Sequence, residues 1–248
     1  MKKFILPIVL LVTVFAAVFW LVANDDQKPA LNNAADNQTT QKDKATPTIK
    51  PPVFDKSKYS TNDPTSIWVV SNKQRSLNPK TYAPSDLVTV SGGQQLRKET
   101  AAALAQMIEA AKAENLYISS LSGYRSYNTQ TSVYNNEVAT NGQAVADTQS
   151  ARPGHSEHQT GLAIDVGGGG CGIEDCFGNT AEGKWVATNA YKYGFIIRYT
   201  ANKQAVTGFR AEPWHIRYVG VDLATEMQKQ GVQTLEEFFG LPAAPSYL

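Results

Sequence analysis

Residues 156–165 read SEHQTGLAID, and a second short motif, EPWH, ends at His215. The first motif supplies His158 and Asp165, and the second adds Glu212 just upstream of His215. Two histidines and one aspartate suit a divalent, borderline-soft ion such as zinc, whose fourth coordination position stays open for water. Glu212 is then a spare carboxylate that can take a proton from that water. Together the motifs predict a metal-assisted hydrolase.

The small number of histidines makes this interpretation specific. The chain contains only three, His155, His158 and His215. A glutamate shortly before a histidine is common by itself, and the spacing from His158 to Asp165 is only moderately specific. Both motifs border predicted strands, and the combination is far more specific than either one. His155 follows a glycine in a predicted loop, so we expect it to be a structural residue and not a ligand.

The composition fits a globular protein and limits the classes of partner that we expect. The chain has 248 residues, a length that allows one good-sized domain or two small ones. Of these residues 42% are hydrophobic and 10% aromatic, which can supply a substantial core. Its net charge of +1 gives no reason to expect a nucleic-acid partner. We expect a monomer.

Two cysteines, Cys171 and Cys176, lie in the sequence CGIEDC. In an exported protein, a disulfide that closes this loop is the expected state. A second metal site is the alternative, but it would need more ligands than the loop displays. We therefore expect the pair to stiffen an insertion beside the cleft.

The first 23 residues predict a membrane anchor. Two lysines precede residues 4–23, an uncharged run dominated by valine, leucine, phenylalanine, isoleucine and alanine. About 20 residues of helix span the hydrocarbon core of a bilayer, and the lysines favour a cytoplasmic N-terminus. The protein would then cross the cell membrane once, with its catalytic domain on the extracytoplasmic side. The alternative is a signal peptide whose cleavage releases a secreted protein.

The sequence predicts that residues 24–62 form a disordered linker and that residues 63–248 form a folded domain. Up to about residue 52 the linker is rich in asparagine, aspartate, glutamine, lysine, threonine, alanine and proline. Such a segment cannot bury enough apolar surface to offset the entropy of ordering it. Both motifs fall within the predicted folded domain.

The sequence of the folded domain predicts an α+β structure with a small, mainly antiparallel sheet flanked by helices. Apolar periodicity, glycines and alanine-rich filling predict these elements. The predicted helices cover residues 95–115, 129–141, 182–193, 222–230 and 235–239, and the predicted strands cover residues 116–121, 162–166, 195–199 and 214–219.

Several longer stretches resemble one known family. They are VVSNK at 69–73, YAPSDLV at 82–88, SGYRSY at 122–127 with Gln130, ARPGHSEH at 151–158, YGFIIRY at 193–199 and EPWHIRYVG at 212–220. They resemble the LAS metallopeptidases, and within them the VanY-type D-alanyl-D-alanine carboxypeptidases and their L,D-carboxypeptidase relatives. The resemblance covers about residues 66–240, and runs of this length are highly specific.

The resemblance implies a hedgehog-like LAS peptidase fold and a zinc carboxypeptidase domain at residues 63–248. It implies one zinc ion held by the two motif histidines and Asp165, with Glu212 as the catalytic base. It also implies that Arg125 acts in catalysis and faces the substrate, while Gln130 and Ser156 help to hold the terminal D-alanine. Arg125 suits either the substrate's carboxylate or the oxyanion that develops at the scissile carbonyl, and the sequence leaves both roles open.

The substrate implied by the resemblance is the stem peptide of peptidoglycan, from which the C-terminal D-alanine is removed. D,D cleavage of pentapeptides, L,D cleavage of tetrapeptides, or both, are compatible with the sequence. A different hypothesis is a non-catalytic wall-binding module with a structural metal. Glu212 argues against that module, because a purely structural site has no use for an acid that binds no metal.

Overall fold

The computed structural model describes residues 53–248. The membrane anchor predicted for residues 1–23, and the linker predicted from residue 24 as far as residue 52, lie outside the described residues. Among the residues that are described, none of the helices combines the length and the apolar character needed to cross a membrane. All of residues 63–248, the predicted folded domain, falls within the described part.

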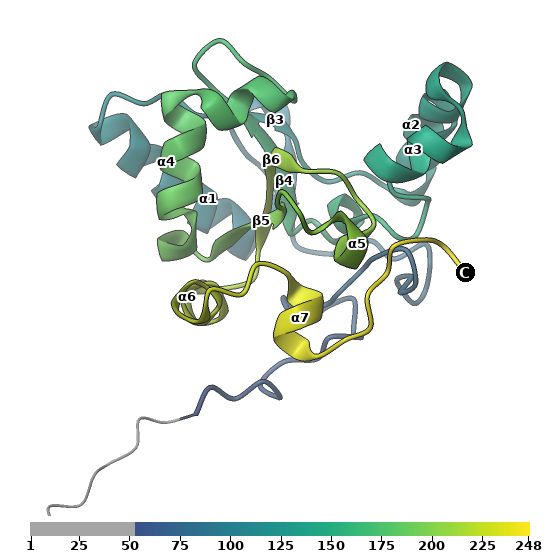
Figure 1. Cartoon of the computed structure of the whole chain (residues 1–248). Coiled ribbons are helices and arrows are strands. Elements are labelled where there is room, and N and C mark those ends of the chain that lie inside the picture. Colours follow the sequence, from purple (N-terminus) through teal and green to yellow (C-terminus); the bar gives the residue numbers. More distant parts are fainter. Residues whose placement is uncertain (1–52) are drawn as a thin grey trace, which may run out of the picture. The chain divides into compact units, whose positions relative to one another are not determined.

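A four-stranded antiparallel sheet forms the centre of the fold (Figure 1). Its strands, in spatial order, are β3 (Ser119–Ser122), β4 (Ala163–Gly167), β6 (Glu212–Tyr218) and β5 (Phe195–Tyr199). Each neighbouring pair of strands is antiparallel. The two motifs therefore lie on the two central strands, where Asp165 pairs directly with His215. The predicted α+β class and antiparallel sheet are confirmed.

The main hydrophobic core covers the face of the sheet turned away from Asp165. Successive side chains of a strand point to opposite faces, so Ile164 and Val166 face this core. Helices α1 (Lys98–Ala113) and α4 (Ala181–Asn189) lie on this side of the sheet, to the left in Figure 1. The larger fully buried members of the core are Leu77, Leu96, Leu104, Met107, Leu162, Ile164, Phe177, Phe195 and Ile216. Burying a side chain of this size contributes roughly 1.5–3 kcal/mol, so the strands that carry the motifs are held firmly.

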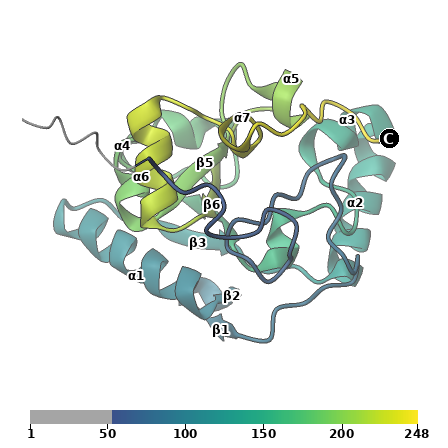
Figure 2. The same cartoon turned by 90° about the horizontal axis from the view of Figure 1, so that it is seen from below.

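A second, smaller core joins the start of the described chain to its C-terminal helices, α6 (Val221–Gln230) and α7 (Leu235–Phe239). Phe54 stacks on Trp68 with ring centroids 5.6 Å apart and meets Phe238 edge-on. Figure 2 shows the dark blue segment that begins beside α6 and runs across the domain. Within residues 53–62, placed in the linker by their sequence, Phe54 and Tyr59 thus contact Trp68 of the folded domain through their aromatic rings.

The remaining elements are shorter or lie at the edges of the domain. They are β1 (Leu87–Thr89), η1 (Ser91–Gly93), β2 (Gln95–Arg97), α2 (Tyr127–Asn141), α3 (Gln143–Gln149), η2 (Glu157–Thr160), η3 (Asp175–Asn179), η4 (Ala190–Tyr193) and α5 (Gln204–Thr207). In Figure 1, α2 and α3 lie on the opposite side of the sheet from α1 and α4. Cys171 and Cys176 form the expected disulfide, which closes the loop between β4 and η3.

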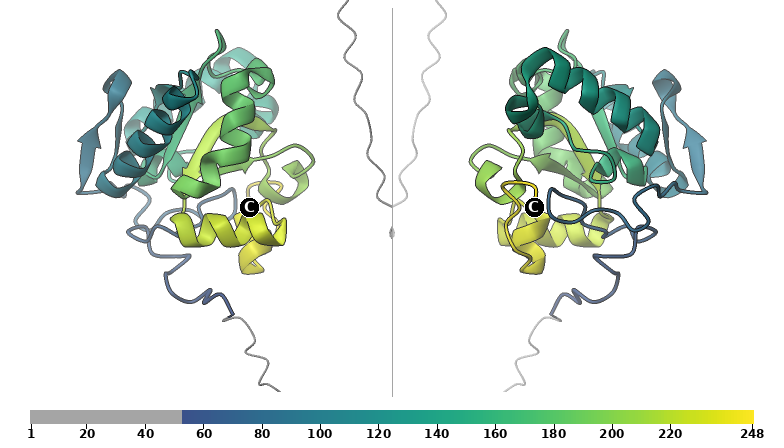
Figure 3. Two further views of the ribbon diagram at one scale, coloured as in Figure 1. Left: turned by 90° about the vertical axis from the view of Figure 1, so that its left-hand side faces the viewer. Right: turned by 90° about the vertical axis from the view of Figure 1, so that its right-hand side faces the viewer.

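One difference from the predicted elements lies before α1. Residues 95–97 were predicted to begin a helix, but they form β2 and pair with β1 in a separate two-stranded antiparallel sheet (Figure 3). Cross-strand hydrogen bonding outweighs the helical spacing of apolar residues there. The helix predicted for residues 182–193 is α4 followed by the 3-10 helix η4. Helix α3 was not predicted because it buries only Ala146 and so has no apolar stripe.

Candidate metal centre

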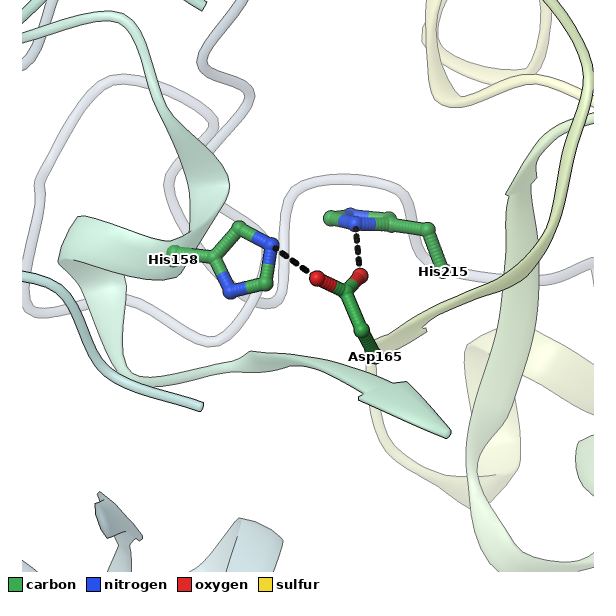
Figure 4. Close-up of side chains that lie close together, drawn as sticks. All are labelled: His158, Asp165 and His215. Atoms are coloured by element: carbon green, nitrogen blue, oxygen red, sulfur yellow. Dashed lines mark hydrogen bonds and ion pairs between the residues drawn. The ribbon is translucent and has the colours of Figure 1, made fainter. Parts of the chain in front are cut away.

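Three buried side chains from two strands and a short helix meet at one point (Figure 4). His158 comes from η2, Asp165 from β4 and His215 from β6. One ligand atom from each lies within 4.8 Å of the others. His158 Nε2 is 3.3 Å from one carboxylate oxygen of Asp165, and His215 Nδ1 is 3.0 Å from the other. The structure thus brings together the three ligands that the motifs predict.

The backbone around the first motif explains how His158 reaches the strands. Gly161 ends η2 with a left-handed φ of +67° and turns the chain into β4. A Cβ atom there would lie 3.0 Å from Arg97 Cγ and 3.1 Å from Leu87 Cδ2, so the position is crowded as well as left-handed. Both constraints favour glycine. The turn places His158 beside Asp165, although the two are seven positions apart.

The ring of His158 is oriented by a backbone carbonyl. Its Nδ1 lies 2.8 Å from the oxygen of Gly123, to which it donates a hydrogen bond. A neutral imidazole donates from one nitrogen and keeps a lone pair on the other, so Nε2 is left as an acceptor facing Asp165. Burial, reinforced by the charge of Arg125, lowers the pKa of His158 to about 4. The ring is therefore neutral at pH 7, which is the form that binds metal ions.

The electrostatic environment at this point favours a positive charge. Burial alone would raise the pKa of Asp165, but the two imidazoles outweigh burial and hold this pKa far below its ordinary value. Burial would lower the pKa of His215, yet hydrogen bonds to Asp165 and Glu157 raise it to about 9. A site whose carboxylate stays ionised and whose histidine readily takes up a proton attracts a cation, whether a proton or a metal ion.

Glu212 reaches the same site through an irregularity in the sheet. Strict alternation along β6 would place residues 212 and 215 on opposite faces. The register between β5 and β6 shifts after Ile197, so that Tyr199 pairs with Glu212. A carboxylate oxygen of Glu212 consequently lies 4.0 Å from Nδ1 of His215. Burial raises the pKa of Glu212 to about 7, and the negative charge of Asp165 adds to the effect.

Arg125 adds a positive charge to the rim of the triad. Its Nη2 lies 3.7 Å from Asp165 Oδ2, and its Nη1 donates to Gln130 Oε1 at 3.0 Å. Gln130 in turn donates from Nε2 to the carbonyl oxygen of Ala151 at 2.7 Å. Gln130 is buried, lines the same cavity as Arg125 and orients its guanidinium through this hydrogen bond.

One cavity of about 340 Å³ contains the whole constellation. All seven predicted metal, catalytic and substrate residues line it, namely Arg125, Gln130, Ser156, His158, Asp165, Glu212 and His215. Val133 of α2 and Ile173 of the disulfide loop also line the cavity. The insertion closed by the disulfide therefore lies beside the cleft, as expected. His155 lies elsewhere, with its Nδ1 2.7 Å from the carbonyl oxygen of Asn72.

Sequence reasoning gave no role to Glu157, which lies between Ser156 and His158. Its side chain is fully buried, and its Oε2 lies 3.4 Å from Nε2 of His215. Tyr199 and Trp214 also line the cavity without having been predicted to do so. For Glu157 the available signal was an acid directly beside a predicted metal ligand. The two aromatic residues offered no signal beyond apolar strand pattern.

The family of this chain follows from comparison with known sequences. Residues 93–221 match the family model for VanY, D-alanyl-D-alanine carboxypeptidase. YodJ of Bacillus subtilis (strain 168), provisionally named a carboxypeptidase, is 46% identical over an alignment of 188 positions, and the match covers 71% of this chain and 68% of YodJ. The chain belongs to the VanY D-alanyl-D-alanine carboxypeptidase family. The matched region of the VanY model contains the triad, Glu212 and Arg125.

Solved structures of VanY-like enzymes share the fold. The L,D-carboxypeptidase LdcB, whose structure addresses peptidoglycan recognition, aligns with a TM-score of 0.66 at 46% identity over 71% of this chain and 87% of LdcB. A mutant of the D,D-pentapeptidase VanY from a VanB-type resistance cassette, solved with Zn(II), aligns with a TM-score of 0.61 at 34% identity over 68% of this chain and 97% of that one. The enzyme class implied by the resemblance, a carboxypeptidase of the VanY family, is confirmed.

Proposed function

We propose that this protein is a zinc-dependent carboxypeptidase that removes the C-terminal D-alanine from peptidoglycan stem peptides. The convergence of His158, Asp165 and His215 in one buried group is the observation that carries the proposal. The VanY relative binds Zn(II) and is a D,D-pentapeptidase, whereas LdcB is an L,D-carboxypeptidase. A stem peptide cut by either specificity is therefore the substrate class that these relatives support.

The triad fits zinc by its chemistry. Two imidazole nitrogens and one carboxylate oxygen are ligands that zinc prefers, and three protein ligands are the usual number in a catalytic site. His158 already has its Nδ1 engaged by Gly123, which leaves Nε2 as the donor to the ion. Zinc bound by these residues supplies Lewis acidity, which activates water and polarises the scissile carbonyl.

Glu212 is the residue placed to move protons during hydrolysis. Its carboxylate lies at the edge of the triad and in the same cavity as Arg125. It accepts a proton as water attacks the carbonyl carbon, and it returns that proton to the amine nitrogen of the departing D-alanine. A carboxyl group with a pKa near neutrality can do both, because it binds and releases a proton at small cost.

Arg125 stabilises the negative charge that develops at the scissile carbonyl. Its guanidinium is planar and permanently charged, and the hydrogen bond to Gln130 fixes its orientation beside Asp165. Preorganised donors of this kind are effective because they need not rearrange as charge develops. Ser156 adds a hydroxyl group to the lining of the same cavity, where it helps to hold the terminal D-alanine.

Release of free D-alanine from defined stem peptides tests the proposal. The full-length protein is incubated with a tetrapeptide, which reports L,D cleavage, and with a pentapeptide, which reports D,D cleavage. We expect release from at least one, loss of release after chelation, and recovery on adding zinc at one equivalent. Release that persists once elemental analysis shows the metal to be gone would refute the zinc mechanism. A zinc-loaded protein that releases nothing would favour the wall-binding module instead.

We also propose that the enzyme acts outside the cytoplasm and is held to the membrane by residues 1–23. The uncharged apolar run behind two lysines supports it, as does the Cys171–Cys176 disulfide, since disulfides persist mainly in oxidising compartments. We expect protease added to intact, wall-stripped cells to digest the membrane-bound domain while a cytoplasmic marker survives. A domain protected until the cells are lysed would contradict this placement, and a domain found only in the medium would indicate cleavage and secretion.

A further inference from the structure

A buried network of four charged side chains adjoins the triad. Glu157 Oε1 accepts hydrogen bonds from Arg198 Nε and from Arg217 Nη1, each at 2.8 Å. Arg198 also donates from Nη2 to Glu236 at 2.7 Å. All four side chains are fully buried. Two acids and two arginines balance in charge, which satisfies the main requirement for burying them.

One oxygen of this network is directed at a predicted zinc ligand. Glu157 Oε2 lies 3.4 Å from Nε2 of His215, whereas Nδ1 of the same ring faces Asp165 at 3.0 Å. The two nitrogens of His215 therefore face two different carboxylates. A neutral imidazole carries its proton on only one nitrogen. If Nδ1, which faces the shared site, gives its lone pair to a metal ion, the proton lies on Nε2, opposite Glu157.

We propose that Glu157 is a positioning residue for His215, accepting a hydrogen bond from Nε2–H and so leaving the lone pair of Nδ1 free for the metal ion. This inference rests on the proposed function, because it concerns the same zinc site. His158 provides the internal parallel, since the carbonyl of Gly123 holds its Nδ1 and leaves Nε2 free. Each histidine is thus held at the nitrogen that faces away from the shared site.

The network explains why Glu157 can hold a fixed position. Arg217 and His215 are two residues apart on β6, so both side chains project from the same face of the strand. Arg217 is itself fixed by Nη2, which donates to the carbonyl oxygens of Ile67 and Val69 at 3.0 and 2.8 Å. Glu157 Oε1 is therefore pinned by two guanidinium groups, and Oε2 is left to contact His215.

Glu157→Gln tests the proposal because an amide has only one accepting oxygen. The two guanidinium donors will draw the amide oxygen, which turns the amide NH₂ group toward Nε2 of His215. That nitrogen must then accept, and the proton moves to Nδ1, the nitrogen needed by the metal. We expect zinc affinity to fall about 10–100-fold, measured on the full-length protein by competition with a chromogenic chelator.

Glu236→Gln is the matched control. It neutralises the other acid of the same buried network and weakens the same partner, Arg198, but Glu236 makes no contact with His215 among the described residues. We expect this variant to bind zinc as the wild type does, even if it unfolds at a lower temperature. An equal loss of zinc affinity in both variants would show a merely structural role and overturn the proposal.

A measurement on the wild-type protein decides the question even if Glu157→Gln does not fold. Nitrogen-15 NMR of labelled histidine reports which ring nitrogen carries the proton. In the zinc-loaded protein we expect a proton on Nε2 of His215 and, as the opposite pattern, on Nδ1 of His158. A proton on Nδ1 of His215 would overturn the proposal. A wild-type protein that binds no zinc would instead defeat the proposed function, so the two failures are distinguishable.

Discussion

Glu212→Gln is expected to lower kcat for D-alanine release by about 10²–10⁴-fold while zinc affinity stays close to that of the wild type. The amide keeps the shape of the side chain but cannot accept and return a proton. Glu212 is not one of the three residues whose ligand atoms converge, so its replacement leaves the zinc ligands in place. Steady-state release of D-alanine gives kcat, and chelator competition gives the zinc affinity of the same preparation.

Glu182→Gln is the control for removing a buried acid. Glu182 and Glu212 are similarly buried, at 8% and 7% exposure, but Glu182 lies on α4 and does not line the cavity. We expect full activity from this control. A Glu212→Gln enzyme that turns over at a rate near the wild type would remove Glu212 as the base. A variant that loses zinc together with activity would make Glu212 a ligand.

The strands that carry the site were predictable because each has a clear local pattern. Residues 195–199 form β5 with the predicted bounds, since a buried apolar run between Gly194 and a polar loop favours a strand. The residues of β2 were misassigned because their partner strand, β1, is only three residues long and carries little signal of its own. Local periodicity cannot report a pairing that is made elsewhere in the chain.

The convergence at the metal centre required information that no local pattern holds. The chemistry of the residue types suggested that His158, Asp165 and His215 share an ion, but only the sheet order places β4 beside β6. Strict alternation along β6 would place Glu212 on the face opposite His215. Glu212 reaches the site where the register between β5 and β6 shifts. Glu157 stayed without a role because its function depends on Arg198 and Arg217, which lie far along the chain.

Arg125→Ala is expected to lower kcat/KM by about 10²–10³-fold, with most of the loss in kcat. The guanidinium lies 3.7 Å from Asp165, so it is close to where the scissile carbonyl must approach the metal ligands. Its Nε is buried and has no hydrogen-bond partner in the described part of the chain. A group that stabilises charge developed only in the transition state affects kcat more than KM.

A peptide whose C-terminal carboxylate is amidated separates the two roles open to Arg125. If Arg125 stabilises the oxyanion, Arg125→Ala should slow cleavage of the acid and of the amide by the same factor. Arg125→Lys should restore little, because an ammonium group lacks the planar fork that Gln130 orients. If the variant instead loses only the preference for the free acid, with its main change in KM, Arg125 binds the substrate carboxylate. The oxyanion must then be stabilised elsewhere in the cavity, and Tyr199, which also lines it, becomes the next side chain to replace.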